Sequence, residues 1–159
     1  IKMMDRLKPK SIVVVSSAPQ IRYPDCYGID MAKLEGLVAF RAALELLKDR
    51  NLYHIVDEVY VKCKKQEDLH DKDVVNFVTE IYAPFKPQEI SDKIAELLSS
   101  PEINAEVKII FQTVENLHIA CPKNLGDWYF TGDYPTPGGN RVVNKAFMNF
   151  YEGKDARAY

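Results

Sequence analysis

The pattern of apolar positions near the start of the chain predicts a helix followed by a strand. Apolar residues recur at helical spacing over residues 1–7, and Pro9 cannot continue a helix. Residues 12–15 are consecutive β-branched apolar residues between serines. Such a run is typical of a strand that is buried on both faces, in a parallel sheet covered by helices. A helix, a turn and a buried strand make up half of a βαβ unit.

The segment 18–30 leaves the carboxyl end of this strand, and Pro19 and Gly28 are among the residues that predict a loop. Ligands of open α/β sheets bind at that end of the strands, so this loop is the first candidate site by position. Asp30 is suited either to cap the next helix or to contact a ligand. Residues 34–48 carry apolar side chains at i, i+3 and i+4, which predicts an amphipathic helix of about four to five turns.

Residues 53–105 differ in character, and we interpret them as a helical insertion. Short helices are expected around residues 55–63, 74–81 and 89–98. The charged segment 62–72 is expected to be solvated. The insertion is suited either to cover a sheet edge or to form a subunit interface, and the pattern does not decide between these roles.

A second strand and a helix follow the insertion. Residues 107–111 predict the strand, and residues 115–120 predict a short helix with Thr113 as its N-cap. From residue 126 onward the chain is rich in aromatic residues and glycine. That composition predicts an irregular, closely packed tail, with one last helix over residues 144–151.

Together these elements predict an α/β fold with a parallel sheet flanked by helices. The chain forms one unit in three parts: a core (1–52), the helical insertion (53–105), and the last strand, helix and tail (106–159). The apolar pattern at Ile1 begins in mid-helix. We therefore expect the chain to be a C-terminal piece of a longer protein.

Composition and charge narrow the class of protein. The chain has 159 residues, of which 47% are hydrophobic and 28% charged, with a net charge of −2. This composition excludes a disordered chain and offers no basic surface for nucleic acid or an anionic membrane. No apolar run is long enough to span a bilayer, and residues 1–10 lack the pattern of a signal peptide. Three widely spaced cysteines signal neither a disulfide framework nor a zinc site, so a reducing cytoplasm is the expected compartment.

The sequence contains no complete active-site motif. Neither a nucleophile elbow nor a phosphate-binding glycine motif occurs, and the pair Gly138–Gly139 indicates only a turn. His118 and Cys121 are three residues apart, but two ligands are too few for a structural zinc. Arg22 is suited either to hold a phosphate through two parallel hydrogen bonds or to form a surface salt bridge. The aromatic residues 128–130 lie between acidic residues, and we expect them to pack onto the sheet rather than stack on bases.

Three stretches resemble segments of the glutamine amidophosphoribosyltransferases. The run SIVVVSSAPQIRYPDCYGIDM (residues 11–31) is similar to a family segment in which a strand ends in Ser-x-x-Pro and continues through Arg-aromatic-Pro to Tyr-Gly-Ile-Asp. IIFQTVENL (residues 109–117) and WYFTGDYPT (residues 128–136) look like two later segments of the family, in the same order. The three stretches cover about a quarter of the chain.

This resemblance implies an enzyme that transfers ammonia from glutamine to C1 of 5-phosphoribosyl 1-pyrophosphate, giving phosphoribosylamine in de novo purine biosynthesis. It implies a phosphoribosyltransferase-type fold, Mg²⁺ bound with phosphoribosyl pyrophosphate, purine nucleotides as effectors, and a homo-oligomer. The family's N-terminal cysteine nucleophile and its acidic substrate-binding pair have no counterpart in this sequence. We therefore expect the chain to hold no Mg²⁺ of its own and to be inactive alone.

The resemblance is to the type of family member without an iron–sulfur cluster. Cys26 lies one place away from the family's first cluster cysteine, and residues 126–129 supply no thiolate at a later position. Because iron–sulfur ligation needs several cysteines together, we expect no cluster.

Position and resemblance together indicate a substrate-side loop, without a catalytic role for any of its residues. Arg22 is expected to approach a phosphate or its counter-charge at the rim of the active site. Tyr27 and Gly28 are expected to shape the backbone turn, because glycine permits positive φ. Two alternatives of other classes are a non-catalytic, phosphoribosyltransferase-like nucleotide-binding module and an oligomerisation module. The candidate residues are Ser16, Ser17, Arg22, Tyr27, Gly28 and Asp30.

Overall fold

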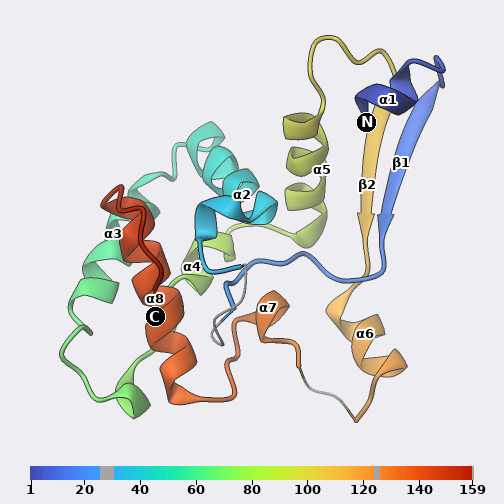
Figure 1. Cartoon of the computed structure of the whole chain (residues 1–159). Helices are drawn as coiled ribbons and strands as arrows, with labels where there is room; N and C mark the ends of the chain where they lie inside the picture. The colour runs from blue at the N-terminus through green and yellow to red at the C-terminus, as the bar shows by residue number, and fades with distance from the viewer. Residues whose placement is uncertain (26–30, 124–125, 159) are drawn as a thin grey trace.

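The computed structural model describes residues 1–25, 31–123 and 126–158. This part of the chain is mostly helical, with one strand near its start and a second after α5 (Figure 1). In chain order the elements are α1 (Lys2–Asp5), β1 (Ser11–Ser16), the 3₁₀ helix η1 (Leu34–Gly36), α2 (Val38–Asp49), α3 (His54–Lys64), η2 (Asp71–Asp73), α4 (Thr79–Tyr82), α5 (Pro87–Leu98), β2 (Glu106–Phe111), α6 (Val114–Ala120), α7 (Trp128–Thr131) and α8 (Pro137–Tyr151).

The two strands pair in parallel, from Ser11 beside Glu106 to Ser16 beside Phe111. Helix α5 packs against β2 on one side and against α2 on the other. Figure 1 accordingly shows α5 between the sheet and the remaining long helices. The expected mixed α/β fold with a parallel sheet is confirmed at this level.

The expectation that β1 is buried on both faces is wrong for the described residues. Ile12 and Ile109 are buried on the face that α5 covers, whereas Val15 and Ile110, on the opposite face, are 71% and 53% exposed. The physical reason is that helices of the described chain cover only one face of the sheet. A run of β-branched residues therefore identified the strand but not its surroundings.

The region 53–105 is helical, as expected, but it is not all peripheral. Helix α3 begins within one residue of its predicted position, whereas α4 is a single turn. Residues 74–78, expected to be helical, instead precede α4. Helix α5 packs directly on β2, so this part of the expected insertion contributes to the sheet layer.

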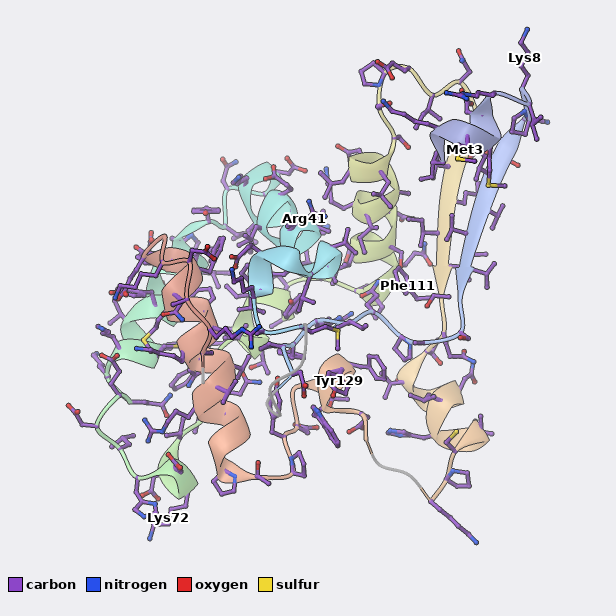
Figure 2. The ribbon with its side chains drawn as sticks, in the orientation of Figure 1. Met3, Lys8, Arg41, Lys72, Phe111 and Tyr129 are labelled. Carbon is purple, nitrogen blue, oxygen red and sulfur yellow. The ribbon has the colours of Figure 1, made fainter. Side chains whose placement is uncertain are left out.

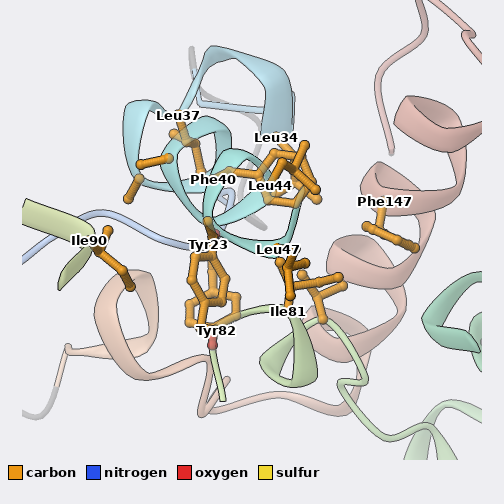
Figure 3. Close-up of a cluster of buried hydrophobic side chains, with 14 of the residues drawn as sticks. Tyr23, Leu34, Leu37, Phe40, Leu44, Leu47, Ile81, Tyr82, Ile90 and Phe147 are labelled. Atoms are coloured by element: carbon orange, nitrogen blue, oxygen red, sulfur yellow. The ribbon is translucent and has the colours of Figure 1, made fainter. Parts of the chain in front are cut away.

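The core lies among α2, α3, α4, α5 and α8, and Figure 3 shows part of it. The rings of Phe40 and Phe147 meet edge to face with centroids 6.3 Å apart, and Phe150 meets Phe40 at 4.9 Å. The prediction of packing onto the sheet concerned the aromatic residues 128–130. For α8 the sequence predicted only a helix with an apolar face, and the residues of that face pack against α2 and α3. Their i, i+3, i+4 and i+7 spacing forms one stripe, which matches the apolar face of another helix.

Helix α8 is longer than the predicted 144–151, because it begins at Pro137. Proline suits the first turn of a helix, where its missing N–H has no intrahelical partner. Gly138 and Gly139 therefore lie inside the helix and not in a turn. By contrast, the predicted cap of α6 is confirmed, since Thr113 Oγ1 accepts a hydrogen bond from the Asn116 N–H at 3.1 Å.

Within the described residues, no helix combines the length and the apolar character needed to cross a bilayer.

A matched pair of glycines tests the packing at the start of α8. A Cβ on Gly139 would lie 2.4 Å from Tyr134 Cβ, whereas a Cβ on Gly138 would meet nothing within 4 Å. We expect Gly139→Ala to lower the free energy of unfolding by about 1–3 kcal/mol through overpacking. Gly138→Ala should be neutral or stabilise by less than about 1 kcal/mol through helix propensity. Urea unfolding of both variants measures this, and equal effects would contradict the close contact.

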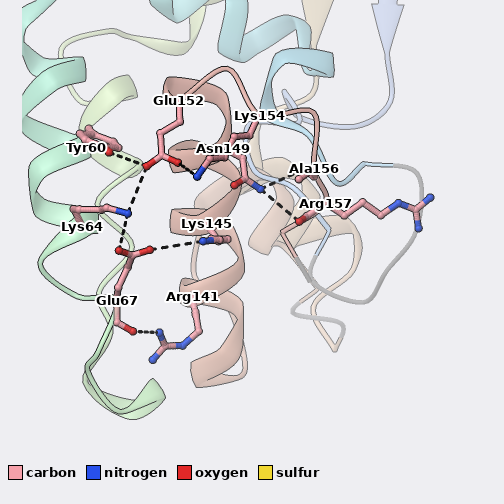
Figure 4. A network of polar contacts seen from close by, with 10 residues as sticks. All are labelled: Tyr60, Lys64, Glu67, Arg141, Lys145, Asn149, Glu152, Lys154, Ala156 and Arg157. Atoms are coloured by element: carbon pink, nitrogen blue, oxygen red, sulfur yellow. Dashed lines mark hydrogen bonds and ion pairs between the residues drawn. The ribbon is translucent and has the colours of Figure 1, made fainter.

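A polar network joins α3 to the end of α8 (Figure 4). Glu152 is its centre: its carboxylate accepts the Tyr60 hydroxyl at 2.8 Å and lies 2.5 Å from Lys154 Nζ and 3.5 Å from Lys64 Nζ. The hydrogen bond from Lys154, followed by that from Tyr60, lowers the pKa of Glu152 to about 2. The folded state therefore binds the proton at this position more weakly than the unfolded state does.

Because the folded-state pKa of Glu152 lies below its ordinary 4.5, the carboxylate stabilises the fold above that value. This stabilisation is lost as the pH falls from about 5 towards 2. We expect Glu152→Gln to lower stability at pH 7 and to flatten the decline of stability over this acid range. Thermal unfolding between pH 7 and pH 2 measures the effect. A variant whose acid decline is as steep as that of the wild type would contradict it.

Candidate functional site

A cavity of about 410 Å³ opens at the carboxyl ends of the two strands. We call it the carboxyl-edge pocket. Its volume is within the usual range for small-molecule sites, about 300–1,000 Å³. The segment after β1, the end of β2 with the start of α6, the first turn of α5, and α7 contribute its lining, which includes Gln20, Arg22, Ser91, Glu115 and Phe130.

Tyrosines and a backbone carbonyl hold the segment after β1 in place. The Tyr129 carbonyl accepts the N–H groups of Arg22 and Tyr23, at 2.8 and 3.1 Å. On the other side, the buried Tyr82 donates its hydroxyl to the Arg22 carbonyl at 2.6 Å. Figure 2 shows Tyr129, on α7, and Phe111, at the end of β2, on either side of this segment. Contacts from α4 and α7 thus fix the backbone of Arg22 from two directions.

The Arg22 side chain is partly buried and lines the pocket. Its Nε and Nη2 donate to Gln20 Oε1 at 3.2 and 2.8 Å, and its guanidinium lies over the Tyr82 ring, 5.4 Å from the centroid. No carboxylate of the described residues forms an ion pair with it, so the salt bridge left open by the sequence is not seen there. Burial lowers the pKa of Arg22 from its usual value, but arginine stays charged in proteins. The pocket therefore contains a partly desolvated cation that no described carboxylate neutralises.

Gln20 was not singled out by the sequence, yet it organises this corner of the pocket. Its side chain is only 4% exposed, and its Nε2 donates to the Pro87 carbonyl at 2.7 Å and to Ser91 Oγ at 2.8 Å. A lone glutamine in a loop belongs to no motif and no periodic pattern. The one feature of the sequence that could have indicated Gln20 is its position, two residues before Arg22 in the loop after β1.

Of the three predicted site residues that the structure describes, Ser16, Ser17 and Arg22, only Arg22 lines the pocket. Ser16 uses its hydroxyl locally, because it donates to the Ala18 carbonyl at 2.9 Å and accepts from the Ala18 N–H at 3.2 Å. Ser17 is exposed and does not line the pocket. The remaining candidates, Tyr27, Gly28 and Asp30, lie outside the described residues.

The predicted helix that Asp30 was to cap starts later than expected. Helix α2 begins at Val38, with Leu37 at the N-cap position and η1 before it. The N-cap of α2 is thus not Asp30. The apolar spacing over residues 34–48 includes η1 as well as α2. Such spacing alone does not distinguish a 3₁₀ turn from the first turn of an α-helix.

Other candidate chemistry does not assemble within the described residues. They contain no group of three or more side chains suited to hold a metal ion. His118 Nε2 instead lies 2.9 Å from Asp127 Oδ2. Burial raises the pKa of the Cys63 thiol to about 12, which keeps it protonated and poorly nucleophilic.

A second cavity, of about 260 Å³, lies beside α3 and α8. Both cations of its lining have carboxylate partners: Arg141 pairs with Asp71, and Lys145 Nζ is 3.7 Å from Glu67 Oε1. A neutralised cation attracts an anionic ligand less strongly than an unneutralised one. The carboxyl-edge pocket is therefore the stronger candidate.

Comparisons of the chain with protein-family models, with curated proteins and with solved structures give no match.

The hydroxyl of Tyr82 offers a test of how the pocket is held. Tyr82→Phe removes the hydrogen bond that the Tyr82 hydroxyl donates to the Arg22 carbonyl. We expect the free energy of unfolding to fall by about 1–2 kcal/mol. Tyr53→Phe, at an exposed position, is the control and should change stability by less than about 0.5 kcal/mol. Chemical denaturation measures both, and equal losses would contradict the assigned role of Tyr82.

Proposed function

We propose that this chain is part of a glutamine amidophosphoribosyltransferase and contributes the C-terminal portion of its phosphoribosyltransferase domain. One observation carries the proposal: Arg22, in the segment that resembles the family most specifically, lines a pocket at the carboxyl ends of parallel strands. Ligands of open α/β sheets bind at this edge. A guanidinium without a described carboxylate partner is suited to a phosphorylated substrate.

In the proposed reaction the carboxyl-edge pocket binds phosphate oxygens of phosphoribosyl pyrophosphate. Arg22 supplies positive charge to these oxygens, and its backbone is fixed before the ligand arrives. Pre-organised charge of this kind stabilises a leaving pyrophosphate without reorganisation during the reaction. Phe130 and Phe111 contribute apolar lining, which reduces the competition from water for the charged groups.

Two parts of the proposed chemistry do not come from this chain. The residues of the sequence offer no counterpart of the family's glutaminase nucleophile or acidic pair. Among the described residues, no group of three or more His, Cys, Asp or Glu side chains suited to hold a metal ion occurs. The role proposed for Arg22 does not depend on that ion. Ribose binding, metal binding and glutamine hydrolysis are assigned to other segments of the enzyme.

Activity of the complete gene product that contains this chain tests the proposal. We expect release of glutamate and pyrophosphate from glutamine and phosphoribosyl pyrophosphate. Arg22→Ala should lower kcat/KM for phosphoribosyl pyrophosphate by about 10- to 100-fold, the usual value of a charged hydrogen bond. Arg41→Ala, at an exposed position on α2, is the control and should retain wild-type activity. Absence of pyrophosphate release would overturn the proposed function.

A second candidate function is a non-catalytic nucleotide-binding module. The same pocket and the same arginine favour it, since neither requires a reaction. This candidate is distinguished by saturable binding of a nucleotide to the complete protein without release of glutamate or pyrophosphate. A homo-oligomer and a cytoplasmic location stay predictions.

A further inference from the structure

The amide of Gln20 connects the guanidinium of Arg22 to the first turn of α5. Its Oε1 faces two N–H donors of Arg22, and its Nε2 faces the Pro87 carbonyl and Ser91 Oγ. The guanidinium offers only donors and the carbonyl only an acceptor, so this orientation of the amide is the one that satisfies both sides. Since Gln20 is buried, its rotamer and that of Arg22 restrain each other.

Gln20 occupies one edge of the guanidinium and leaves the other edge available. Of the five N–H donors of an arginine, the Nε–H and one Nη2–H bind Gln20. The remaining donors, on the Nη1/Nη2 edge, have no hydrogen-bond acceptor within the part of the chain that the structure describes. This edge has the fork geometry that binds two oxygens of one oxyanion.

The neutrality of the Gln20 partner is the decisive feature. A glutamate at this position would pair with Arg22 and cancel its charge, and it would also lose the donor that binds the Pro87 carbonyl. The amide fixes the guanidinium and leaves the charge intact, although a partly buried charge without a counter-ion is costly. That cost is recovered when an anion binds.

We propose that the carboxyl-edge pocket is a phosphate-binding subsite in which Arg22 binds the phosphate group and Gln20 is the positioning residue that holds Arg22 without neutralising it. This deepens the proposed function and rests on it for the identity of the biological ligand. Phosphate binding itself is measurable without turnover, so the two proposals fail separately.

A phosphate fits the pocket better than a carboxylate does. The first turn of α5, a twelve-residue helix, lines the pocket through Pro87, Gln88 and Ser91 beside Arg22. A dianion gains more from the charge of the guanidinium than a monoanion does. The cavity volume of about 410 Å³ is also larger than a single carboxylate group fills. Glu115, exposed on the lining, opposes any anion and serves below as an internal control.

The test is equilibrium binding of inorganic pyrophosphate, inorganic phosphate and acetate to the full chain, by calorimetry at low and moderate salt. We expect saturable binding in the order pyrophosphate, phosphate, acetate, weakening as salt rises. Arg22→Ala should weaken pyrophosphate binding by about 10- to 100-fold. Acetate binding as tight as phosphate binding, or an Arg22→Ala variant equal to the wild type, would overturn the subsite.

Two substitutions at position 20 separate positioning from a merely structural role. Gln20→Glu keeps the size of the side chain, loses only its hydrogen-bond donor to the Pro87 carbonyl and Ser91, and cancels the charge of Arg22. Pyrophosphate binding should therefore fall by about 10-fold or more and lose its salt dependence. Gln20→Ala removes every hydrogen bond of the side chain but leaves the charge, so binding should fall less and stay salt-dependent. If Gln20 only supports the fold, Gln20→Ala should weaken pyrophosphate binding more than Gln20→Glu does. That result would overturn the positioning role. Circular dichroism establishes that each variant is folded.

Glu115→Gln keeps the proposal falsifiable even where a variant at position 20 does not fold. This substitution lies at an exposed position and removes a negative charge from the lining of the pocket. We expect pyrophosphate to bind about 2- to 5-fold more tightly, and the gain to disappear at high salt. An unchanged affinity would show that anions do not bind in this pocket. Loss of pyrophosphate binding with turnover intact would overturn the subsite alone, whereas binding without turnover would overturn the proposed enzyme alone.

Discussion

The fold depends on the position of α5 between the sheet and the other helices. Its buried residues Ile90 and Ile94 belong to the same apolar cluster as Phe40 on α2 and Ile109 on β2. A two-stranded sheet on its own is at best marginally stable in water, so burial against α5 is what holds the strands. The first turn of the same helix reaches Gln20 through Pro87 and Ser91. One helix therefore supports the sheet and also fixes a wall of the pocket.

The sequence predicted those elements whose signal is local. The β-branched run at 12–15, the strand near 107–111 and the Thr113 cap all depend on neighbouring residues, and the structure has them at or next to the expected positions. What failed depends on distant residues. Whether Val15 is covered follows from the placement of helices far away in the chain, which periodicity does not encode.

The same distinction applies to the pocket. Arg22 was predicted because a strand-end loop is a common place for ligand groups, and it does line the cavity. Gln20 was missed because its role arises from contacts with residues 87 and 91, about seventy positions later. A neutral amide carries no charge or motif that a reader of one sequence would single out. Ser16 was predicted from its position at the end of the strand. In the structure its hydroxyl instead donates a hydrogen bond to the nearby Ala18 carbonyl.

The uncovered face of the sheet has a consequence for how the protein is handled. Val13, Val15 and Ile110 are about half exposed or more, on strands that each pair on only one side within the described chain. An apolar strand with free backbone donors and acceptors is a template for pairing with another chain. Preparations of this chain should therefore tend to associate through this sheet as concentration rises. The substitution Val15→Lys places a charge on the exposed face of the sheet, away from α5, and should reduce this association.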